Sequence, residues 1–429
     1  VLSGPAAGIT GATTVAAAAG YPHIITFDMG GTSTDVALVT GGESSVKMEQ
    51  EVSGHPIRMP MHDINTVGAG GGSIAYVDSG GHLKVGPQSA GADPGPACYG
   101  QGGTEPTVTD ANVALAILSR ESLLGGEMSI DAAASDRAVD GLADKLGLGR
   151  EEVAQGIIDL ATANMARAIR VITVQRGYDP RDYAVVAFGG AGPLHAARLA
   201  RELEIPRILV PMTPGILSAF GLLVADLRTD FSRTQVLPTD GETLTTANTR
   251  FEELERQAET WFVHEEIPVA QRQMKRIADM RYVGQNYELP VEVPERPLTA
   301  SDLAPTLDAF HAAHEQAYGY AAADERVQFV TFRLEATGGV SRPELPRVSS
   351  GGRAEDARLG ARRVYLPEAG GWTDVPVYDR TRLGALMDIS GPAIIEQTDS
   401  TTLVLPSQRV EVDDYGNLIV TETEQEEAE

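Results

Sequence analysis

A ten-residue stretch decides the fold: Phe27-Asp28-Met29-Gly30-Gly31-Thr32-Ser33-Thr34-Asp35-Val36. The apolar residues from His23 to Phe27 predict a strand, and Val36 to Val39 predict a second one, so the glycines between them indicate a hairpin turn. Glycine has no Cβ, and the backbone N–H groups of Gly30 and Gly31 can therefore approach a phosphate closely. The stretch predicts a phosphate-binding hairpin.

The side chains of this hairpin suit the same ligand. Thr32, Ser33 and Thr34 add three hydroxyl groups, which we expect to contact the phosphate. Asp28 is the candidate ligand for Mg²⁺, because a protein-bound magnesium ion typically takes one or two carboxylates together with substrate phosphates. Asp28 is therefore also the candidate catalytic residue. An ordinary Gly-Gly turn, with Asp28 as a turn residue, is the alternative.

A second glycine cluster lies further along the chain, within Gly68-Ala69-Gly70-Gly71-Gly72-Ser73. Three consecutive glycines can form a nest of inward N–H groups for an anion. Gly70, Gly71 and Gly72 are therefore candidate cofactor-binding residues, and a flexible loop is an equally good interpretation.

A third glycine cluster follows an apolar strand predicted from Tyr183 to Phe188 and precedes a helix predicted from Leu194 to Leu203. Bare backbone at the start of a helix lets a base or ribose lie close to the chain. The order of strand, glycine turn and helix predicts a nucleotide-binding edge. Its candidate residues are Gly189, Gly190 and Gly192.

Several titratable side chains suggest chemistry, but a structural role is favoured for each. His62 and Asp63 would serve as ligand or base, and a solvated pair is the favoured alternative. Cys98 lies in a proline-braced loop without the histidine spacing of a thiolate nucleophile or a zinc site, which favours a small buried residue. Packing roles with ordinary hydrogen bonds are favoured for the histidines on predicted helices, which are His195, His311 and His314.

The composition limits the class of protein. Of 429 residues, 34 are Lys or Arg and 60 are Asp or Glu, which gives a formal net charge of −26. So acidic a chain repels a phosphate backbone, and nucleic acid is not an expected partner. No apolar stretch approaches the roughly 20 residues that span a bilayer, so no membrane partner is expected either. The one cysteine cannot close an intrachain disulfide, and we expect a cytoplasmic protein.

The pattern along the chain predicts an α/β domain over residues 1–235, a smaller α+β to all-β domain over residues 236–420 and an acidic, disordered tail at 421–429. The glycine-rich segment 66–104 is expected to be an irregular loop. The main elements predicted are helices at 151–176, 251–262 and 302–318, strands at 280–293 and 327–336, and short strands after residue 363.

Six motifs in register resemble the hydantoinase A and oxoprolinase family. They are LSGPAAG at 2–8, FDMGGTSTDV at 27–36, TVGAGGGSIA at 66–75, VGPQSAGADPGPACYG at 85–100, PTVTDAN at 106–112 and AFGGAGPLHA at 187–196. The resemblance continues through PGILSAFGLL at 214–223 and FHAAHEQAYGY at 310–320, so it covers nearly the whole chain.

This resemblance implies an ATPase half-domain of the actin, sugar kinase and Hsp70 type, which is ribonuclease H-like. It matches Asp28 to Thr34 with the second phosphate loop and Gly189 to Gly192 with the adenosine loop. Family members carry an amino-terminal half with another phosphate loop, and no second DxGGT motif occurs here. The chain resembles the carboxyl-terminal three-fifths of such a subunit, so we expect the missing amino-terminal half or a separate chain to complete the nucleotide cleft.

The resemblance further implies a function. The expected activity is that of an ATP-dependent cyclic amidohydrolase subunit, which phosphorylates the carbonyl of a lactam or hydantoin for hydrolysis. ATP and Mg²⁺ are the implied cofactors, and a hydantoinase B-type subunit is the implied partner. A ketone carboxylase subunit of the acetone or acetophenone type is the alternative within the family. A nucleotide-driven conformational subunit without its own catalysis is the alternative from another class.

Overall fold

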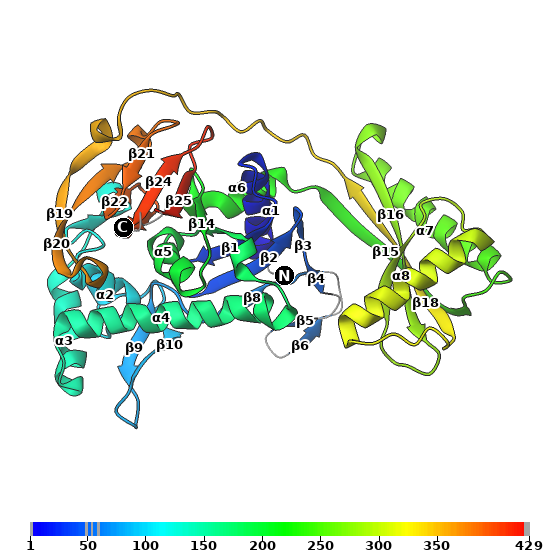
Figure 1. Ribbon diagram of the computed structural model, residues 1–429, viewed down its shortest axis with the longest axis horizontal. Coiled ribbons are helices and arrows are strands. Elements are labelled where there is room, and N and C mark those ends of the chain that lie inside the picture. Colours follow the sequence, from blue (N-terminus) through cyan, green and yellow to red (C-terminus); the bar gives the residue numbers. More distant parts are fainter. Residues whose placement is uncertain (1–2, 48–49, 53–54, 58–60, 424–429) are drawn as a thin grey trace, which may run out of the picture. The chain divides into compact units, whose positions relative to one another are not determined.

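A mixed β-sheet of nine strands runs through the larger part of the computed structural model, which describes residues 3–47, 50–52, 55–57 and 61–423. In chain order the strands are β1 (Ile24–Met29), β2 (Thr34–Thr40), β3 (Glu43–Ser44), β8 (Asn65–Val67), β13 (Ala184–Phe188), β14 (Arg207–Val210), β21 (Asp388–Ser390), β24 (Gln408–Val412) and β25 (Leu418–Glu422). In space the order is β21-β24-β25-β14-β13-β1-β2-β3, and β8 pairs with β2 (Figure 1). Strands β1, β13 and β14 are mutually parallel, and the remaining pairs are antiparallel.

Helices cover both faces of this sheet. Because side chains alternate along a strand, Ile24 lies in one apolar layer, while Ile25, Phe27 and Met29 lie in the other. The first layer also holds apolar residues of α1 (Ser3–Ala18) and α6 (Leu217–Val224), and the second holds those of α2 (Val108–Ala114), α3 (Ala132–Leu146), α4 (Arg150–Ile172) and α5 (Gly192–Glu202). The result is a three-layered α/β/α unit.

The predicted central hairpin is confirmed. Strands β1 and β2 pair in antiparallel register, with Phe27 opposite Val36 and Asp28 opposite Asp35. The predicted strand, glycine turn and helix near residue 190 are also confirmed, as β13 and α5, and β13 runs parallel to β1. The long helix predicted from residue 151 is α4. Each of these elements has a local sequence pattern strong enough to predict it.

The chain divides differently from the predicted domains. One compact unit comprises residues up to 224 and from 343 onward, and the other comprises Ala225–Arg342. The carboxyl-terminal segment rejoins the first unit because β25 pairs with β14 in the main sheet. The predicted boundary at 235 falls inside β15 (Leu227–Pro238), and the predicted tail start at 421 falls inside β25. Residues 424–429 of that tail lie outside the described residues.

Smaller sheets complete the first unit. The predicted irregular loop at 66–104 contains a hairpin of β9 (Ser73–Val77) and β10 (Leu83–Ser89), so that prediction was wrong for these residues. The short strands predicted after residue 363 are confirmed, and they belong to a four-stranded sheet that begins at Arg358. This sheet is formed by β19 (Arg358–Leu366), β20 (Gly371–Asp379), β22 (Ala393–Glu396) and β23 (Thr401–Val404). Three further two-stranded pairs are β4 (Val46–Lys47) with β7 (Met61–His62), β5 (Gln50–Val52) with β6 (His55–Ile57), and β11 (Ser122–Leu123) with β12 (Met128–Ser129).

The second unit has its own core. Its sheet has the order β15-β18-β16-β17, with β18 (Val327–Gly338), β16 (Arg272–Tyr282) and β17 (Leu289–Val293), and helices α7 (Leu244–His264) and α8 (Ala300–Tyr318) pack on it. The single strand predicted at 280–293 is therefore two strands joined by a turn. The α8 histidines have the predicted hydrogen bonds: His311 Nδ1 lies 2.7 Å from the Tyr282 hydroxyl, and His314 Nδ1 lies 2.7 Å from the Tyr320 carbonyl oxygen.

A search of the described helices for a membrane span finds none with the required length and apolar character.

The crossing of α1 and α6 depends on glycine. A Cβ on Gly221 would lie 1.7 Å from the carbonyl oxygen of Ala7. Gly221→Ala should therefore force the helices apart and lower the free energy of unfolding by about 1–3 kcal/mol, as overpacking typically does. Gly141 in α3 is the matched control, because a Cβ there meets nothing within 4 Å. Gly141→Ala should raise stability by up to about 1 kcal/mol. Urea unfolding measures both, and equal effects would contradict the tight crossing.

Candidate functional site

Two of the predicted glycine loops touch through their backbones. The N–H of Gly71 donates to the carbonyl of Gly30 at 3.0 Å, and the N–H of Gly72 donates to the carbonyl of Gly31 at 2.6 Å. A Cβ on Gly70 would lie 2.7 Å from backbone atoms of Gly31 and the following residue. Such a contact admits no side chain, so Gly70 is required by close approach rather than by flexibility.

The predicted nest at residues 70–72 is not formed. Gly70 donates its N–H to the Ser73 hydroxyl at 2.8 Å, and the other two amides serve the hydrogen bonds to the first loop. The free amides lie in the first loop instead: among the residues that the structure describes, the N–H groups of Gly31, Thr32 and Ser33 have no acceptor. These three amides are the candidate donors for an anion.

Thr34 has a different role from the predicted phosphate contact. It is fully buried, and its hydroxyl donates to the carbonyl of Ala69 at 2.5 Å. This hydrogen bond fastens the first glycine loop to the second. The hydroxyls of Thr32 and Ser33 remain the candidates for contact with a ligand, since Thr32 is exposed and Ser33 is partly exposed.

The third glycine loop lies against the end of β1. The N–H of Ala191 donates to the carbonyl of Met29 at 2.9 Å. Gly189 has a φ of +78°, and a Cβ there would lie 2.5 Å from Asp28 Oδ1. Any other residue at position 189 would therefore displace the Asp28 carboxylate. The three predicted glycine clusters thus converge at one end of the main sheet.

Two carboxylates share this end of the sheet. Asp28 and Asp35 occupy opposite positions in the β1–β2 register, so their side chains leave the same face. Burial, and to a lesser extent the charge of Asp35, raise the pKa of Asp28 to about 6. Burial also raises the pKa of Asp35, although the Thr66 hydroxyl, 2.5 Å from Asp35 Oδ1, opposes that rise. Asp28 was predicted from the sequence, whereas Asp35 was not. The predicted hairpin could have indicated Asp35, because it lies opposite Asp28.

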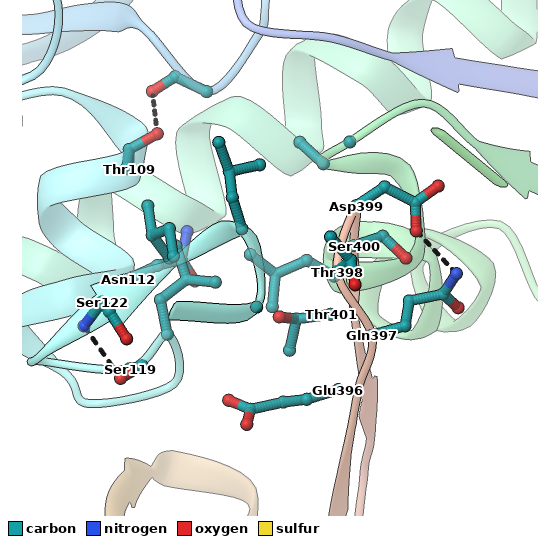
Figure 2. A pocket seen from close by; sticks show the side chains of 18 of the residues that line it. Thr109, Asn112, Ser119, Ser122, Glu396, Gln397, Thr398, Asp399, Ser400 and Thr401 are labelled. Carbon is teal, nitrogen blue, oxygen red and sulfur yellow. Dashed lines mark hydrogen bonds between the residues drawn. The ribbon is translucent and has the colours of Figure 1, made fainter. Parts of the chain in front are cut away.

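A cavity of about 660 Å³ opens beside the glycine loops. One wall comes from α2 and the β11 region, and the other comes from the turn between β22 and β23 (Figure 2). Gly30, Gly31, Gly71 and Gly190 form its rim next to the loops. The second wall was not predicted, because residues 396–401 carry no motif that points to a ligand.

Two residues at the start of α2, Thr109 and Asp110, form hydrogen bonds with the neighbouring loops, and neither was predicted as a site residue. Thr109 donates both its N–H and its hydroxyl to the carbonyl of Gly71, at 2.8 and 2.9 Å. Asp110 is fully buried and accepts hydrogen bonds from the N–H of Cys98 at 2.9 Å and from the Ser135 hydroxyl at 2.6 Å. Asp110 and Thr107 form a capping box, and this local sequence pattern could have predicted the position of Asp110.

Cys98 and His195 are both buried, which agrees with the packing roles expected for them. Cys98 is fully buried, and burial, followed by the charge of Asp110, raises the pKa of its thiol to about 12. His195 is buried at the cavity wall, with Nε2 3.5 Å from the Asn112 amide nitrogen. Burial, assisted by Arg198, lowers the pKa of His195 to about 3, so its imidazole is neutral.

The predicted solvated pair of His62 and Asp63 is wrong for Asp63. Its side chain is only 5% exposed and forms ion pairs with Lys47, at 2.7 Å, and Arg176. Burial favours protonation, but the hydrogen bonds from Arg176 and Lys47 outweigh it and lower the pKa of Asp63. His62 Nδ1 lies 2.6 Å from the Ser44 hydroxyl. Neither residue lines the cavity.

Few described side chains are placed to bind a metal ion. Within residues 3–47, 50–52, 55–57 and 61–423, no group of three or more His, Cys, Asp or Glu side chains is placed to hold an ion. Mg²⁺ needs only one or two carboxylates when phosphates and water supply the other ligands. Asp28 and Asp35 fit that requirement, and they would not suit a metal that needs a complete protein cage.

Comparison with known proteins identifies the family. The hydantoinase/oxoprolinase model matches residues 1–231, and the hydantoinase/oxoprolinase C-terminal domain matches residues 238–422. The chain therefore belongs to the hydantoinase/oxoprolinase family. Both matched segments meet near the predicted boundary at 235, although the compact units divide elsewhere.

Individual relatives extend this result. The chain is 37% identical to the caprolactamase subunit alpha of Pseudomonas jessenii over 96% of the chain and 60% of that protein. It is 35% identical to the acetophenone carboxylase gamma subunit of Aromatoleum aromaticum over 97% of the chain and 59% of that protein. The crystal structure of the ATP-dependent caprolactamase from Pseudomonas jessenii superimposes with a TM-score of 0.85 at 36% identity, covering 98% of this chain and 61% of that one. The chain spans about three fifths of these relatives.

The raised pKa of Asp28 predicts a gain in stability when its charge is removed. The pKa of Asp28 is about 6 in the folded chain and 3.8 as the ordinary value of the unfolded chain. Ionisation of this carboxyl therefore lowers the free energy of unfolding, and the loss is complete above pH 6. Asp28→Asn should raise the free energy of unfolding at pH 7.5 by about 1–2 kcal/mol, less than the full shift implies because the carboxyl is partly exposed. At pH 5 the advantage should shrink. Urea unfolding at both pH values is the measurement, with exposed Asp144→Asn as control. A pH-independent gain would contradict the assignment.

Cys98 should be chemically silent in the folded chain. With a thiol pKa of about 12, only about one molecule in ten thousand carries a thiolate at pH 8. Iodoacetamide should therefore label Cys98 only after unfolding in urea, and mass spectrometry gives the rates. Cys98→Ser should retain turnover in the complete enzyme. Rapid labelling of the folded chain, or loss of turnover with an unchanged melting temperature, would show that the thiol takes part in the reaction.

Proposed function

We propose that this chain is the subunit of an ATP-dependent cyclic amidohydrolase that binds the nucleotide and activates a lactam or hydantoin carbonyl. The observation that carries the proposal is that three free amides, at Gly31, Thr32 and Ser33, and the Asp28 and Asp35 carboxylates belong to one hairpin, whose Gly30 and Gly31 line a cavity. Amides of this kind bind phosphate oxygens, and the carboxylates are the ligands that Mg²⁺ prefers.

The strand order supports an ATPase core of the actin, sugar kinase and Hsp70 type. Strands β3, β2, β1, β13 and β14 are adjacent in that order, with a meander of antiparallel strands followed by two parallel crossovers. In this core the phosphate-binding hairpin is β1–β2, and the adenosine loop is the turn from Gly189 to Gly192. Both turns follow the same ends of the adjacent strands β1 and β13, which supports a shared ligand.

The chain's own groups would act by position and charge. When bound, ATP supplies the phosphoryl group that makes a carbonyl carbon electrophilic toward water. The amides at residues 31–33 would orient phosphate oxygens, and Asp28, with Asp35 beside it, would hold Mg²⁺. Because its pKa is about 6, Asp28 is largely ionised at neutral pH and able to bind the cation. No protein nucleophile is required, which agrees with a buried, protonated Cys98.

The substrate class rests on the relatives. Identity of 37% to a caprolactamase subunit favours a cyclic amide. Identity of 35% to an acetophenone carboxylase subunit supports the second candidate, activation of a ketone for carboxylation. A purely conformational, nucleotide-driven subunit is the third, and it differs in one observable: ATP hydrolysis would not depend on a lactam or ketone substrate. Relatives named as subunits, together with their greater length, support a B-type partner and an amino-terminal half that complete the enzyme.

The test of this function is Asp28 in the complete enzyme. Asp28→Asn should lower substrate-stimulated ATP turnover on the order of a hundredfold or more, because it removes the carboxylate that holds the cation. Wild-type turnover should also fall below pH 6, where Asp28 becomes protonated. Phosphate release with caprolactam, a hydantoin and acetophenone as substrates is the assay, with Asp144→Asn as control. Normal turnover of Asp28→Asn would remove Asp28 from the mechanism.

A further inference from the structure

The second compact unit, which contains α7 and α8, takes no part in the candidate site (Figure 1). It comprises Ala225–Arg342, all of which the structure describes, and none of its residues lines the cavity. It nevertheless contains FHAAHEQAYGY at 310–320, one of the segments that carry the family resemblance. Any contribution of this segment to the function must therefore lie outside the cavity.

Three exposed tyrosines gather at the end of α8. Among the tyrosines in the described part of the chain, four are exposed, which are Tyr76, Tyr287, Tyr318 and Tyr320. The last three form one cluster, here named the tyrosine patch. The ring centroids of Tyr287 and Tyr318 lie 6.3 Å apart, and those of Tyr318 and Tyr320 each lie 4.8 Å from the ring of His314. Exposed aromatic clusters of this kind are typical of protein–protein contact sites.

Buried side chains hold the tyrosine patch in place. His314 is buried, and its Nδ1 lies 2.7 Å from the carbonyl oxygen of Tyr320. The Tyr282 hydroxyl accepts a hydrogen bond from the N–H of Ala322 at 2.8 Å and lies 2.7 Å from His311 Nδ1. These bonds fix the chain that follows α8. Because the surface is formed in advance, a partner that binds it pays little conformational entropy.

A packing role does not account for the tyrosine patch. Tyr282 in the adjacent sheet has such a role: it is 3% exposed, and its ring centroid lies 5.0 Å from that of Phe310. The three patch tyrosines, in contrast, are 47% to 70% exposed. Removing this aromatic surface from water is favourable, and Tyr is among the residues that contribute most to protein–protein affinity.

The charge around the tyrosine patch is negative. Segment 315–325 contains no Lys or Arg and carries three exposed carboxylates, from Glu315, Asp324 and Glu325. The nearest basic residues along the chain are Arg326 and Arg281, and Arg281 pairs with Glu288 at 3.4 Å. An aromatic centre with acidic neighbours suits Lys and Arg side chains, because carboxylates and the faces of tyrosine rings both attract cations.

We propose that the tyrosine patch is the docking surface for the B-type partner subunit, which presents Lys or Arg side chains to it. The inference rests on the proposed function for the identity of the partner and adds the place and the chemistry of the contact. It gives a role to a separately folded unit that contributes nothing to the cavity.

Hydroxyl-radical footprinting read by mass spectrometry shows what covers the tyrosine patch. The full-length subunit is labelled alone and after addition of the purified B-type subunit of the same enzyme. Tyr287, Tyr318 and Tyr320 should be labelled in the subunit alone and should lose their labelling in the complex. Tyr76 in β9 is the matched control, because it is exposed but belongs to the first unit, and its labelling should not change.

Three footprinting results would overturn the inference. Protection of the tyrosine patch in the full-length subunit alone would show that another part of that subunit, such as its amino-terminal half, covers the patch. Protection that increases with the concentration of the subunit alone would show that a second copy covers it. Unchanged labelling of the patch in the assembled enzyme would place it outside the interface.

Substitutions measure the contribution of the patch to affinity. Tyr318→Ala should weaken the association of the two subunits about thirtyfold, as truncation of a strong interface residue typically does. Tyr318→Phe should restore most of the affinity, because the ring remains. Tyr287→Ala should also weaken association, and Tyr76→Ala should not. Analytical ultracentrifugation gives the affinities, and wild-type affinity of both Tyr318→Ala and Tyr287→Ala would overturn the docking surface.

The salt dependence of association tests the charge of the partner. Association should weaken as the salt concentration rises, because salt screens the attraction between the acidic segment and a basic surface. The triple variant Glu315→Gln, Asp324→Asn and Glu325→Gln should lose most of this dependence. An association of the wild-type subunits that does not respond to salt would overturn the basic chemistry assigned to the partner.

The catalytic variant separates this inference from the proposed function. Asp28→Asn should assemble normally and lose turnover, whereas Tyr318→Ala should recover turnover when the B-type subunit is in excess. Full turnover of Asp28→Asn would overturn the proposed catalytic role and leave the docking surface intact. A tyrosine patch that stays labelled in the active, assembled enzyme would overturn the docking surface and leave the catalytic role intact.

Discussion

The site depends on a contact that excludes side chains. Three chain segments meet at the end of β1, and at two of them a single Cβ would collide with backbone or carboxylate atoms at 2.5–2.7 Å. Gly70 lets the second loop lie on the first, and Gly189 leaves room for the Asp28 carboxylate. The hydrogen bonds from Gly71 and Gly72 use the carbonyls of the first loop, while its amides at residues 31–33 have no acceptor in the described part of the chain. The proposed anion binding would therefore follow from how the loops are packed.

The same packing places a destabilising group at the centre of the site. Asp28 is held partly buried and opposite a second carboxylate, and both conditions disfavour its charged form. The surrounding structure tolerates this because β1 is anchored on both sides, by β2 and by β13. A cation would offset both the burial and the repulsion, so the cost of ionising Asp28 and the proposed affinity for Mg²⁺ would have one cause.

The sequence predicted those elements whose structure depends on neighbouring residues. The hairpin at Gly30, the helix α4 and the turn at Gly189 each follow from neighbouring residues, and the resemblance matched the first and third glycine clusters with two loops of one nucleotide site. The errors concern partners far along the chain. Thr34 was predicted to face a phosphate, but its hydroxyl bonds Ala69, and Asp63 was predicted to be solvated, but Arg176 and Lys47 neutralise it. No periodicity reports such pairings, since they depend on which segments the sheet brings together.

The second cavity wall is the largest feature that local patterns could not predict. Residues 396–401 join β22 to β23 in the four-stranded sheet, which forms after the chain has left the first unit and returned from residues 225–342. The entropic cost of closing so long a loop grows only slowly with its length, about 0.6 kcal/mol for each doubling, so a folded unit can be inserted without preventing this return. The turn is tied to the segment after β14 by hydrogen bonds from the Gly215 N–H to Asp399, at 2.8 Å, and from the Gln397 amide to the Met212 carbonyl, at 3.4 Å. Because β14, β13 and β1 are adjacent in the main sheet, these contacts hold the wall near the glycine loops without requiring any particular placement of the inserted unit.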